Sequence, residues 1–214
     1  MANRPVFAAF RKAPYSVTYH MDFVWNAGLS ISQKKKNIRA LHEAFHQKCP
    51  DAAVLEISSK SEDPIGTALS AFSLKKFVPS LGVSVPVECV FQGGKKFLYG
   101  GPYMDLYLAS AREAKRDERL KTSGPLCGFF FEGKDFPLKP ETAFYDWLYI
   151  NALLEAPALA EQVLKYDAFT DIEFNPEKSK NCQARAAALF VSLSRLGLLE
   201  RCRDYDTFVE FLVP

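Results

Sequence analysis

The pattern of apolar and polar residues predicts strands near the amino end and mostly helices after them. Residues 6–10 and 16–25 are rich in β-branched and aromatic side chains, which is typical of strands. A capping serine, Ser30 or Ser32, then begins a helix that ends before Pro50. Apolar side chains recur along this helix at spacings of three and four, which gives it one buried face made of Ile38, Leu41 and Phe45.

The rest of the chain predicts scattered strands among longer helices. Strand patterns cover residues 53–57, 83–87 and 126–131, and residues 171–174 are expected to be extended. Helix patterns cover residues 88–97, 103–120, 142–166 with a break at Pro157, 179–199, and a last turn or two over 205–213. Because strands are few and helices dominate the second half, the expected class is α+β.

The amino-acid composition excludes several classes of protein. The 214 residues are 48% apolar and 14% aromatic, enough for a sizeable core, which excludes a disordered chain. The five cysteines include no C-x-x-C pair, which argues against a zinc ribbon or a thioredoxin-type site and favours free thiols in a reducing compartment. No apolar run approaches the ~18 residues of a membrane span, and no secretory signal begins the chain. We therefore expect a soluble cytoplasmic protein with no membrane partner.

Charge is distributed unevenly along the chain. The formal net charge is only +2, yet residues 1–50 hold eight basic and two acidic side chains, and the remaining residues hold 19 and 23. Part of the basic excess is a run at the start of the first expected helix: Lys34, Lys35, Lys36 and Arg39. Such a run is usually a solvated helix start, but lysines there oppose the positive end of the helix dipole. Contact with a partner that carries phosphates is the second interpretation.

The segment His42-Glu43-Ala44-Phe45-His46 matches the H-E-x-x-H pattern of zinc hydrolases, in which two histidines one turn apart bind the metal. It falls on an expected helix, as that pattern requires. The continuation that would supply a third ligand is absent, because Gln-Lys-Cys-Pro follows His46, and the remaining histidine, His20, lies on an expected strand. An ordinary amphipathic helix is the preferred interpretation, so we expect no metal and no cofactor.

A carboxylate, an amide and an ammonium share one face of the helix expected over residues 88–97. Glu88, Gln92 and Lys95 stand at positions i, i+4 and i+7. Such a face is often an exposed ion pair, but Glu88 directly follows an apolar strand and should be at least partly buried. Burial favours the neutral form of a carboxyl group and suits it to acid or base chemistry.

This Glu-x-x-Phe-Gln-x-x-Lys segment resembles the central motif of the NADAR (YbiA-like) family, and four further segments follow the family's order over about residues 55–199. Residues 58–72, which end in Leu-Ser-Ala-Phe, resemble its S…D…G…FSNF loop, and residues 114–119 resemble its A-x-R-x-G-R segment. Residues 144–166 resemble its long helical region, and Glu173 with Lys180-Asn181 resembles its late E…G-K-N stretch. Ala71 stands where the family has Asn, and Glu118 where it has Gly.

Residues 1–54, together with Thr-Ala-Phe-Tyr-Asp-Trp-Leu-Tyr-Ile at residues 142–150, are similar to the NADAR antitoxin branch paired with DarT-type DNA ADP-ribosyltransferase toxins. The resemblance implies a mostly helical domain with a small sheet over residues 55–214 and an α/β extension over residues 1–54 packed on it. It also implies N-glycosidic hydrolysis that removes ADP-ribose from guanine bases in DNA. A DarT-type toxin encoded alongside is the implied protein partner.

The resemblance gives the candidate residues their roles. Glu88 is the expected acid or base, and Lys95 is expected to hold the diphosphate or to attack the opened ribose aldehyde as a Schiff base. Further side chains are expected to bind the substrate: Ser70, Phe72, Gln92, Tyr103, Arg116, Arg119, Asp171, Glu173 and Asn181. The basic run Lys34, Lys35, Lys36 and Arg39 is expected to touch the DNA backbone that flanks the modified guanine.

Several alternatives stay open. Arg116 and Arg119 are equally well read as ordinary surface arginines, Tyr103 as packing at a rim, and Asp171 and Glu173 as turn-capping residues. Among functions, the alternatives are hydrolysis of a small free N-glycoside such as a riboflavin intermediate, neutralisation of a toxin by docking without turnover, and, least favoured, a zinc hydrolase.

Overall fold

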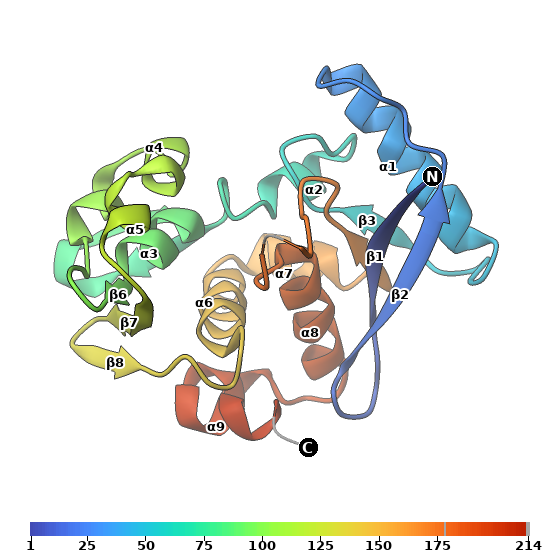
Figure 1. The fold of residues 1–214 in the computed structure, drawn as a ribbon. Coiled ribbons are helices and arrows are strands. Elements are labelled where there is room, and N and C mark those ends of the chain that lie inside the picture. Colours follow the sequence, from blue (N-terminus) through green and yellow to red (C-terminus); the bar gives the residue numbers. More distant parts are fainter. Residues whose placement is uncertain (178, 213–214) are drawn as a thin grey trace.

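The computed structural model describes residues 1–177 and 179–212, and its main sheet has four strands in the order β2-β1-β9-β3 (Figure 1). The strands are β1 Ala2–Ala9, β2 Ser16–Phe23, β3 Val54–Glu56 and β9 Ala168–Thr170. β1 and β2 form an antiparallel hairpin, β9 runs antiparallel to β1, and β3 runs parallel to β9. The parallel pair brings the carboxyl ends of β3 and β9 to the same end of the sheet.

One helix covers each face of this sheet. α1 Ile31–His46 lies on one face and α8 Gln183–Arg195 on the other (Figure 1). Side chains alternate between the two faces of a strand. Val6 therefore joins the core beneath α1 with Leu41, whereas its neighbour Phe7 joins the core beneath α8. The predicted apolar face of the first helix is confirmed, since Ile38, Leu41 and Phe45 are all buried.

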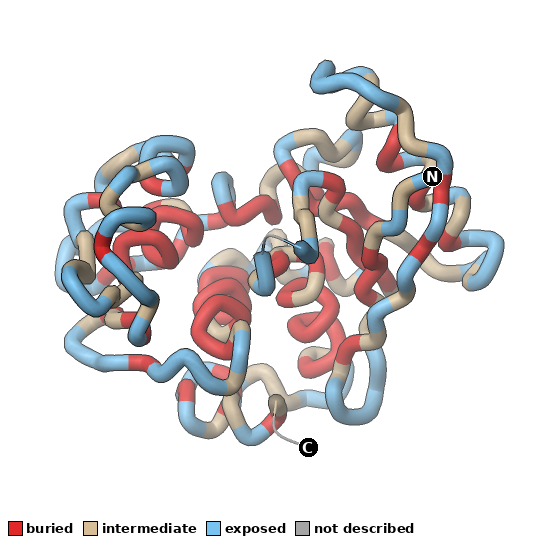
Figure 2. The backbone as a smooth tube through the Cα atoms, in the orientation of Figure 1, coloured by how far each residue is buried: buried red, intermediate tan, exposed pale blue. Residues whose placement is uncertain are grey.

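α6 Ala143–Leu154 packs against α8 on the side away from the main sheet (Figure 1). Small side chains on α8 allow the two helices to approach closely, and four of them are fully buried: Ala184, Ala186, Ala187 and Ala188. Figure 2 shows both helices as nearly continuous buried backbone. Pro157 begins α7 Pro157–Val163, which confirms the predicted break in this helical stretch.

A second group of short elements lies on the far side of α6. It contains the hairpin of β4 Lys75–Val78 and β5 Val83–Pro86, the helices α3 Val87–Gly93, α4 Ala111–Arg116 and α5 Arg119–Thr122, and the 3₁₀ helix η2 Met104–Leu108. A three-stranded antiparallel sheet of β6 Lys95–Phe97, β7 Leu126–Phe131 and β8 Lys134–Phe136 completes the group. The strand expected over residues 126–131 is confirmed.

The remaining elements are α2 Pro64–Ala68 and the 3₁₀ helices η1 Pro79–Leu81 and η3 Leu199–Arg203, together with α9 Tyr205–Glu210. Helices and sheets occur together, so the α+β class is confirmed. Residues 1–54 share the main sheet with β3 and β9, and the domain division expected at residue 54 stays a prediction. Within the described residues, none of the helices combines the length and apolar character that crossing a membrane requires.

The helix predicted over residues 88–97 is wrong in its second half, because α3 ends at Gly93. The carbonyls of Gly93 and Gly94 accept from the N–H groups of Tyr103 and Phe130, so they leave the helical pattern. A Cβ atom on Gly94 would lie 2.6 Å from the Phe130 carbonyl oxygen, so only glycine fits this crossing. Lys95 consequently begins strand β6 and is not the third member of a helical face.

The single helix predicted over residues 103–120 is also wrong. The segment divides into η2, α4 and α5, because short polar side chains take backbone N–H groups at the breaks. Ser110 and Glu113 form a capping box at the start of α4, and Asp117 Oδ1 accepts from the Arg119 N–H at its end. The orientation of α4 therefore differs from that of a continuous helix.

Two further expectations near the carboxyl end need correction. Residues 171–174 are a turn and not extended, because Asp171 Oδ1 accepts from the Glu173 N–H at 3.0 Å. The strand is β9, directly before them. The helix expected over residues 179–199 is the shorter α8, which starts at Gln183. In the last stretch, expected over residues 205–213, α9 covers residues 205–210 and a turn covers 211–212, whereas residue 213 lies outside the described residues.

Candidate functional site

Glu88 lies in the first turn of α3 and is held by the protein interior. Only 5% of the residue is exposed, which confirms the burial expected after an apolar strand. Its N–H donates to the Ala71 carbonyl at 2.9 Å, and Gln92 Nε2, one turn later, donates to Glu88 Oε1 at 2.9 Å. A carboxylate with a fixed orientation and little water around it is suited to acid or base chemistry.

Lys95 reaches the same place from β6. Its Nζ donates to Gln92 Oε1 at 2.6 Å and lies 4.8 Å from the centre of the Phe91 ring. Burial lowers the pKa of Lys95 to about 8, against the opposing effect of Glu88. Glu88, Gln92 and Lys95 are therefore joined side chain to side chain, although the predicted element for Lys95 was wrong.

Lys115 of α4 closes this group from the solvent side. Its Nζ lies 3.6 Å from Glu88 Oε1 and 5.2 Å from the centre of the Phe72 ring. The Lys115 side chain is 58% exposed, whereas that of Glu88 is 7% exposed. We call Phe72, Glu88, Gln92, Lys95 and Lys115 the Glu88 cluster. The sequence-based prediction gave Lys115 no role, because the direction in which it points depends on the unpredicted break before α4.

The turn that follows β9, residues 171–174, is tied to the Glu88 cluster through one glutamine. Gln183 Nε2 donates to Asp171 Oδ2 at 2.9 Å, and Gln183 Oε1 accepts from the Ala71 N–H at 2.7 Å. The Ala71 carbonyl in turn accepts from the Glu88 N–H. Gln183 is a second candidate residue that the sequence analysis missed, and only its place at the start of the last long helix hinted at it.

Burial, and to a lesser extent the nearby Glu56, raise the pKa of Asp171 to about 8, although hydrogen bonds from the Glu173 N–H and Gln183 and the charge of Lys115 oppose the shift. The positive charge of Lys115 also lowers the pKa of Lys95. Its ammonium therefore acts on ionisable groups of three elements, namely α3, β6 and the turn after β9. Asp171 can therefore remain protonated near neutral pH.

A buried chain of hydrogen bonds supports the Asp171 turn from the other side. Thr170 Oγ1 donates to Glu56 Oε2 at 2.6 Å, and the Ile172 N–H donates to Glu56 Oε1 at 2.9 Å. His42 Nε2 lies 2.8 Å from Thr170 Oγ1, which has already given its proton to Glu56, so the histidine is the donor. Burial lowers the pKa of His42 to about 4, which keeps it neutral.

The H-E-x-x-H pattern does not form a metal site in this arrangement. His42 Nε2 lies 2.8 Å from Thr170 Oγ1, and His46 Nε2 donates to the Ala52 carbonyl at 3.0 Å, so each Nε2 atom is already engaged by a different protein partner. Across residues 1–177 and 179–212, no three His, Cys, Asp or Glu side chains gather closely enough to hold a metal ion. The residues present do not fit the zinc hydrolase alternative.

The other expected substrate-binding residues lie in several places. Ser70 is buried in the loop before Phe72, and its Oγ accepts from the Phe72 N–H at 3.4 Å. Glu173 is exposed and pairs with Lys34 at 3.3 Å, and Asn181 is half-buried at the approach to α8. Arg116 is exposed on α4, next to Lys115 in sequence.

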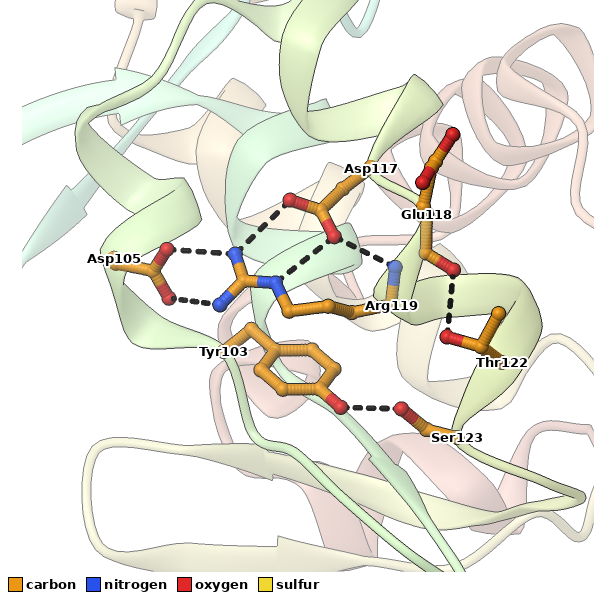
Figure 3. A network of polar contacts seen from close by, with 7 residues as sticks. All are labelled: Tyr103, Asp105, Asp117, Glu118, Arg119, Thr122 and Ser123. Atoms are coloured by element: carbon orange, nitrogen blue, oxygen red, sulfur yellow. Dashed lines mark hydrogen bonds and ion pairs between the residues drawn. The ribbon is translucent and has the colours of Figure 1, made fainter.

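Arg119 and Tyr103 belong to a separate group, the Arg119 network, shown in Figure 3. The guanidinium lies between two carboxylates, 2.7 Å from Asp105 Oδ2 and 2.9 Å from Asp117 Oδ1, and 4.4 Å from the centre of the Tyr103 ring. The Tyr103 hydroxyl shares a hydrogen bond with Ser123. One face of the Tyr103 ring is therefore covered, and the Arg119 donors are engaged.

The basic run lies along the first half of α1. Arg39 pairs with Glu62 at 2.6 Å and Lys35 lies 4.0 Å from the same carboxylate, whereas Lys36 is exposed. Lys34 pairs with Glu173, so the start of α1 adjoins the turn that carries Asp171. The structure thus brings the basic run beside one end of the site, with part of its charge balanced by carboxylates.

Together, these contacts bring four separate stretches of chain to one place: the loop before Phe72, α3 with β6, α4, and the Asp171 turn. The result is a buried carboxylate, a second protonatable carboxyl group and two ammonium groups, which is a set suited to general acid–base cleavage of an anionic substrate. In comparisons with known proteins, a family model described as DarT1-associated NADAR antitoxin matches residues 2–214. No curated protein matches the chain.

Proposed function

The chain belongs to the DarT1-associated NADAR antitoxins, and from that premise we propose that it is an N-glycosyl hydrolase that removes ADP-ribose from guanine bases in DNA. The family description supports an antitoxin role and implies a DarT-type toxin as the counterpart. Reversal of the modification would then be the way in which the chain protects the cell from the toxin. The observation that carries this proposal is the buried Glu88 with its two ammonium neighbours.

The proposed reaction breaks one bond and forms one. Water adds to C1″ of the ribose, the C1″–N bond to guanine breaks, its electron pair goes to the base, and the base takes up a proton. The transition state resembles an oxocarbenium ion and carries positive charge, which a nearby carboxylate stabilises. Glu88 is the proposed acid or base, because its side chain is fixed by Gln92 and shielded from water.

Lys95 has two possible contributions in this mechanism. As an ammonium ion it would hold the diphosphate of the ADP-ribosyl group. As a free amine, which a pKa of about 8 makes accessible near neutral pH, it would attack C1″ in place of water, and guanine would leave with the electron pair of the C1″–N bond and a proton. The ribose ring would then open to give a Schiff base, which water hydrolyses to release ADP-ribose and the free amine. The two roles differ in whether arginine can replace the lysine.

Asp171 and Gln183 support the sugar end of the proposed site. Asp171 is close enough to Glu56 and Lys115 for its protonation to depend on both. In the proposed complex, the Asp171 carboxyl group binds ribose hydroxyls, and Gln183 fixes its orientation through the 2.9 Å hydrogen bond. Ser70, Glu173 and Asn181 lie on the segments around it and stay proposed binding residues.

The basic run on α1 is the proposed contact for DNA that flanks the modified base. The Lys34–Glu173 pair supports this, because it joins the start of α1 to the turn that carries Asp171. Lys36 is exposed, and Lys35 and Arg39 share a single carboxylate, so the run keeps a net positive charge. Phosphate contacts of this kind position a strand without reading its sequence.

The experiment is to incubate the purified chain with oligonucleotides that carry ADP-ribose on guanine or on thymine and to measure released ADP-ribose by mass spectrometry. We expect repeated turnover on the guanine substrate. Release from free ADP-ribosyl-guanosine without release from the oligonucleotides would instead favour the small-substrate alternative. Stoichiometric binding of the toxin, with no ADP-ribose released from any substrate, would contradict the enzyme and favour a docking antitoxin.

A further inference from the structure

Lys115 is held loosely at the open side of the Glu88 cluster. The 3.6 Å from Nζ to Glu88 Oε1 is an ion-pair distance and too long for a hydrogen bond. The Phe72 ring, 5.2 Å away and 37% exposed, supports the ammonium from the other side. Within residues 1–177 and 179–212, Lys115 makes no other ion pair, so its three donors are available to an incoming anion.

The other cations nearby are less suited to that anion. Arg119 is already engaged by Asp105 and Asp117. Lys95 is buried and donates to Gln92, and its lowered pKa leaves it partly neutral near pH 8. Arg116 follows Lys115 directly, so it points about 100° away around α4. Lys115 alone among these four combines exposure, a loose partner and contact with Glu88.

Resting on the proposed function, we infer that Lys115 binds the diphosphate of the ADP-ribosyl group and exchanges Glu88 for phosphate oxygens as the substrate enters. In the free protein the ammonium compensates the buried carboxylate. When phosphate binds the ammonium, Glu88 loses this ion-pair partner but stays oriented by Gln92, so its carboxylate becomes available to the arriving ribose. A substrate without a phosphate near its sugar does not draw Lys115 away, so this side chain also selects ADP-ribosyl groups over phosphate-free N-glycosides.

The experiment measures two quantities on wild type, Lys115→Met, Lys115→Arg and the control Arg112→Met, which removes an exposed charge from the same helix. The first is the Kd of free ADP-ribose by calorimetry, and the second is the split between KM and kcat on guanine-modified DNA. For Lys115→Met we expect both Kd and KM to rise about tenfold or more, the size of one lost charge-assisted hydrogen bond. The kcat value should fall less, Lys115→Arg should restore most of the binding, and Arg112→Met should behave as wild type.

The outcomes separate this inference from the proposed function. If wild type turns over the substrate and Lys115→Met leaves Kd and KM unchanged, Lys115 is not the diphosphate ligand and the function stands. A matching rise in KM for Arg116→Met or Arg119→Met but not for Lys115→Met would likewise overturn the assignment. If wild type neither binds ADP-ribose nor releases it from DNA, both the function and the inference are wrong.

Discussion

The Glu88 cluster and the Arg119 network lie close together in the chain, since Lys115 and Arg119 are four residues apart, yet they balance charge in opposite ways. In the Arg119 network one guanidinium faces two carboxylates, as Figure 3 shows. In the Glu88 cluster two ammonium groups surround one buried carboxylate. The positive charge of the Arg119 network is therefore paired within the group, whereas the Glu88 cluster contains more ammonium groups than carboxylates.

From this difference we infer that the Arg119 network is structural, and it supports the Glu88 cluster as the proposed functional group. The Arg119 network joins η2 to α4 and α5 through neighbouring partners, which suits a brace for irregular chain. The Glu88 cluster gathers side chains from stretches far apart in sequence, and it leaves Lys115 loosely paired. An anionic substrate such as ADP-ribose would complete the charge balance of the second group only.

The largest expected loss of turnover among the variants that test this contrast is at Lys95. Lys95→Ala should lower turnover on guanine-modified DNA by ~10² or more, because the cluster loses a positioned proton-transfer or nucleophilic group. Lys95→Arg should retain substantial turnover if the ammonium only holds phosphate. If Lys95 forms a Schiff base, arginine cannot replace it and borohydride should trap a covalent adduct in the wild type. Full activity of Lys95→Ala would exclude both roles.

The next effect concerns the pH dependence of stability at Asp171. Because its pKa is raised to about 8, the folded state binds this proton more tightly than the unfolded state. The stability that the proton provides is full below about pH 4 and is lost as the pH rises to about 8, at no more than about 1.4 kcal/mol per pH unit. Asp171→Asn should make this decline shallower in denaturant unfolding series, because Glu56, whose pKa burial also raises, keeps its own share. Asp51→Asn, an exposed control, should keep the full decline. Identical pH profiles for wild type and Asp171→Asn would contradict the burial of the group.

A smaller effect is expected for the basic run on α1. Changing Lys34, Lys35, Lys36 and Arg39 to glutamine should raise KM for modified DNA and flatten its salt dependence, by a log–log slope of about 0.7 per lost contact on single strands. Cleavage of free ADP-ribosyl-guanosine should stay unchanged. The control changes Arg11 and Lys12, two exposed charges in the β1–β2 turn. If the α1 variant treats long and short substrates alike at every salt concentration, the run does not contact DNA.

The smallest effect on turnover is expected at the H-E-x-x-H segment. His46→Ala should alter stability more than activity, because His46 only donates to the Ala52 carbonyl. Turnover should also survive chelators. Elemental analysis of the purified protein provides the check, and stoichiometric zinc together with chelator-sensitive activity would contradict the description of both histidines as hydrogen-bond donors.

Much of the fold followed from local patterns. The presence of strands β1 and β2, the buried face of α1 and the break at Pro157 depend on side-chain periodicity and on proline, which act over a few residues. The burial of Glu88 also followed from its place behind an apolar strand. The helix breaks that depend on residues distant in sequence could not be predicted from local patterns. The crossing at Gly93 and Gly94 depends on Phe130 and Tyr103, which no local pattern reveals.

The candidate site likewise contains contacts that could be predicted from local sequence and contacts that could not. Glu88 and Gln92 lie one turn apart on a helix, so their contact was predictable from spacing. Lys115 and Gln183 join the site from helices 27 and 95 residues further along, with the direction of α4 set by its cap at Ser110 and that of α8 by packing against α6. Arg119, in contrast, was expected among the substrate-binding side chains, and only the structure brings Asp105 to its guanidinium.

The most direct test of the central claim compares the two groups in one assay. The measurement is the single-turnover rate of ADP-ribose release from guanine-modified DNA by wild type, Glu88→Gln and Arg119→Met, with folding of each checked by circular dichroism. The account predicts that Glu88→Gln keeps its fold and loses a factor of ~10² or more in rate, the scale of a missing acid or base. It predicts that Arg119→Met stays near the wild-type rate. A near-normal rate for Glu88→Gln, or an equal loss in both variants, would contradict it.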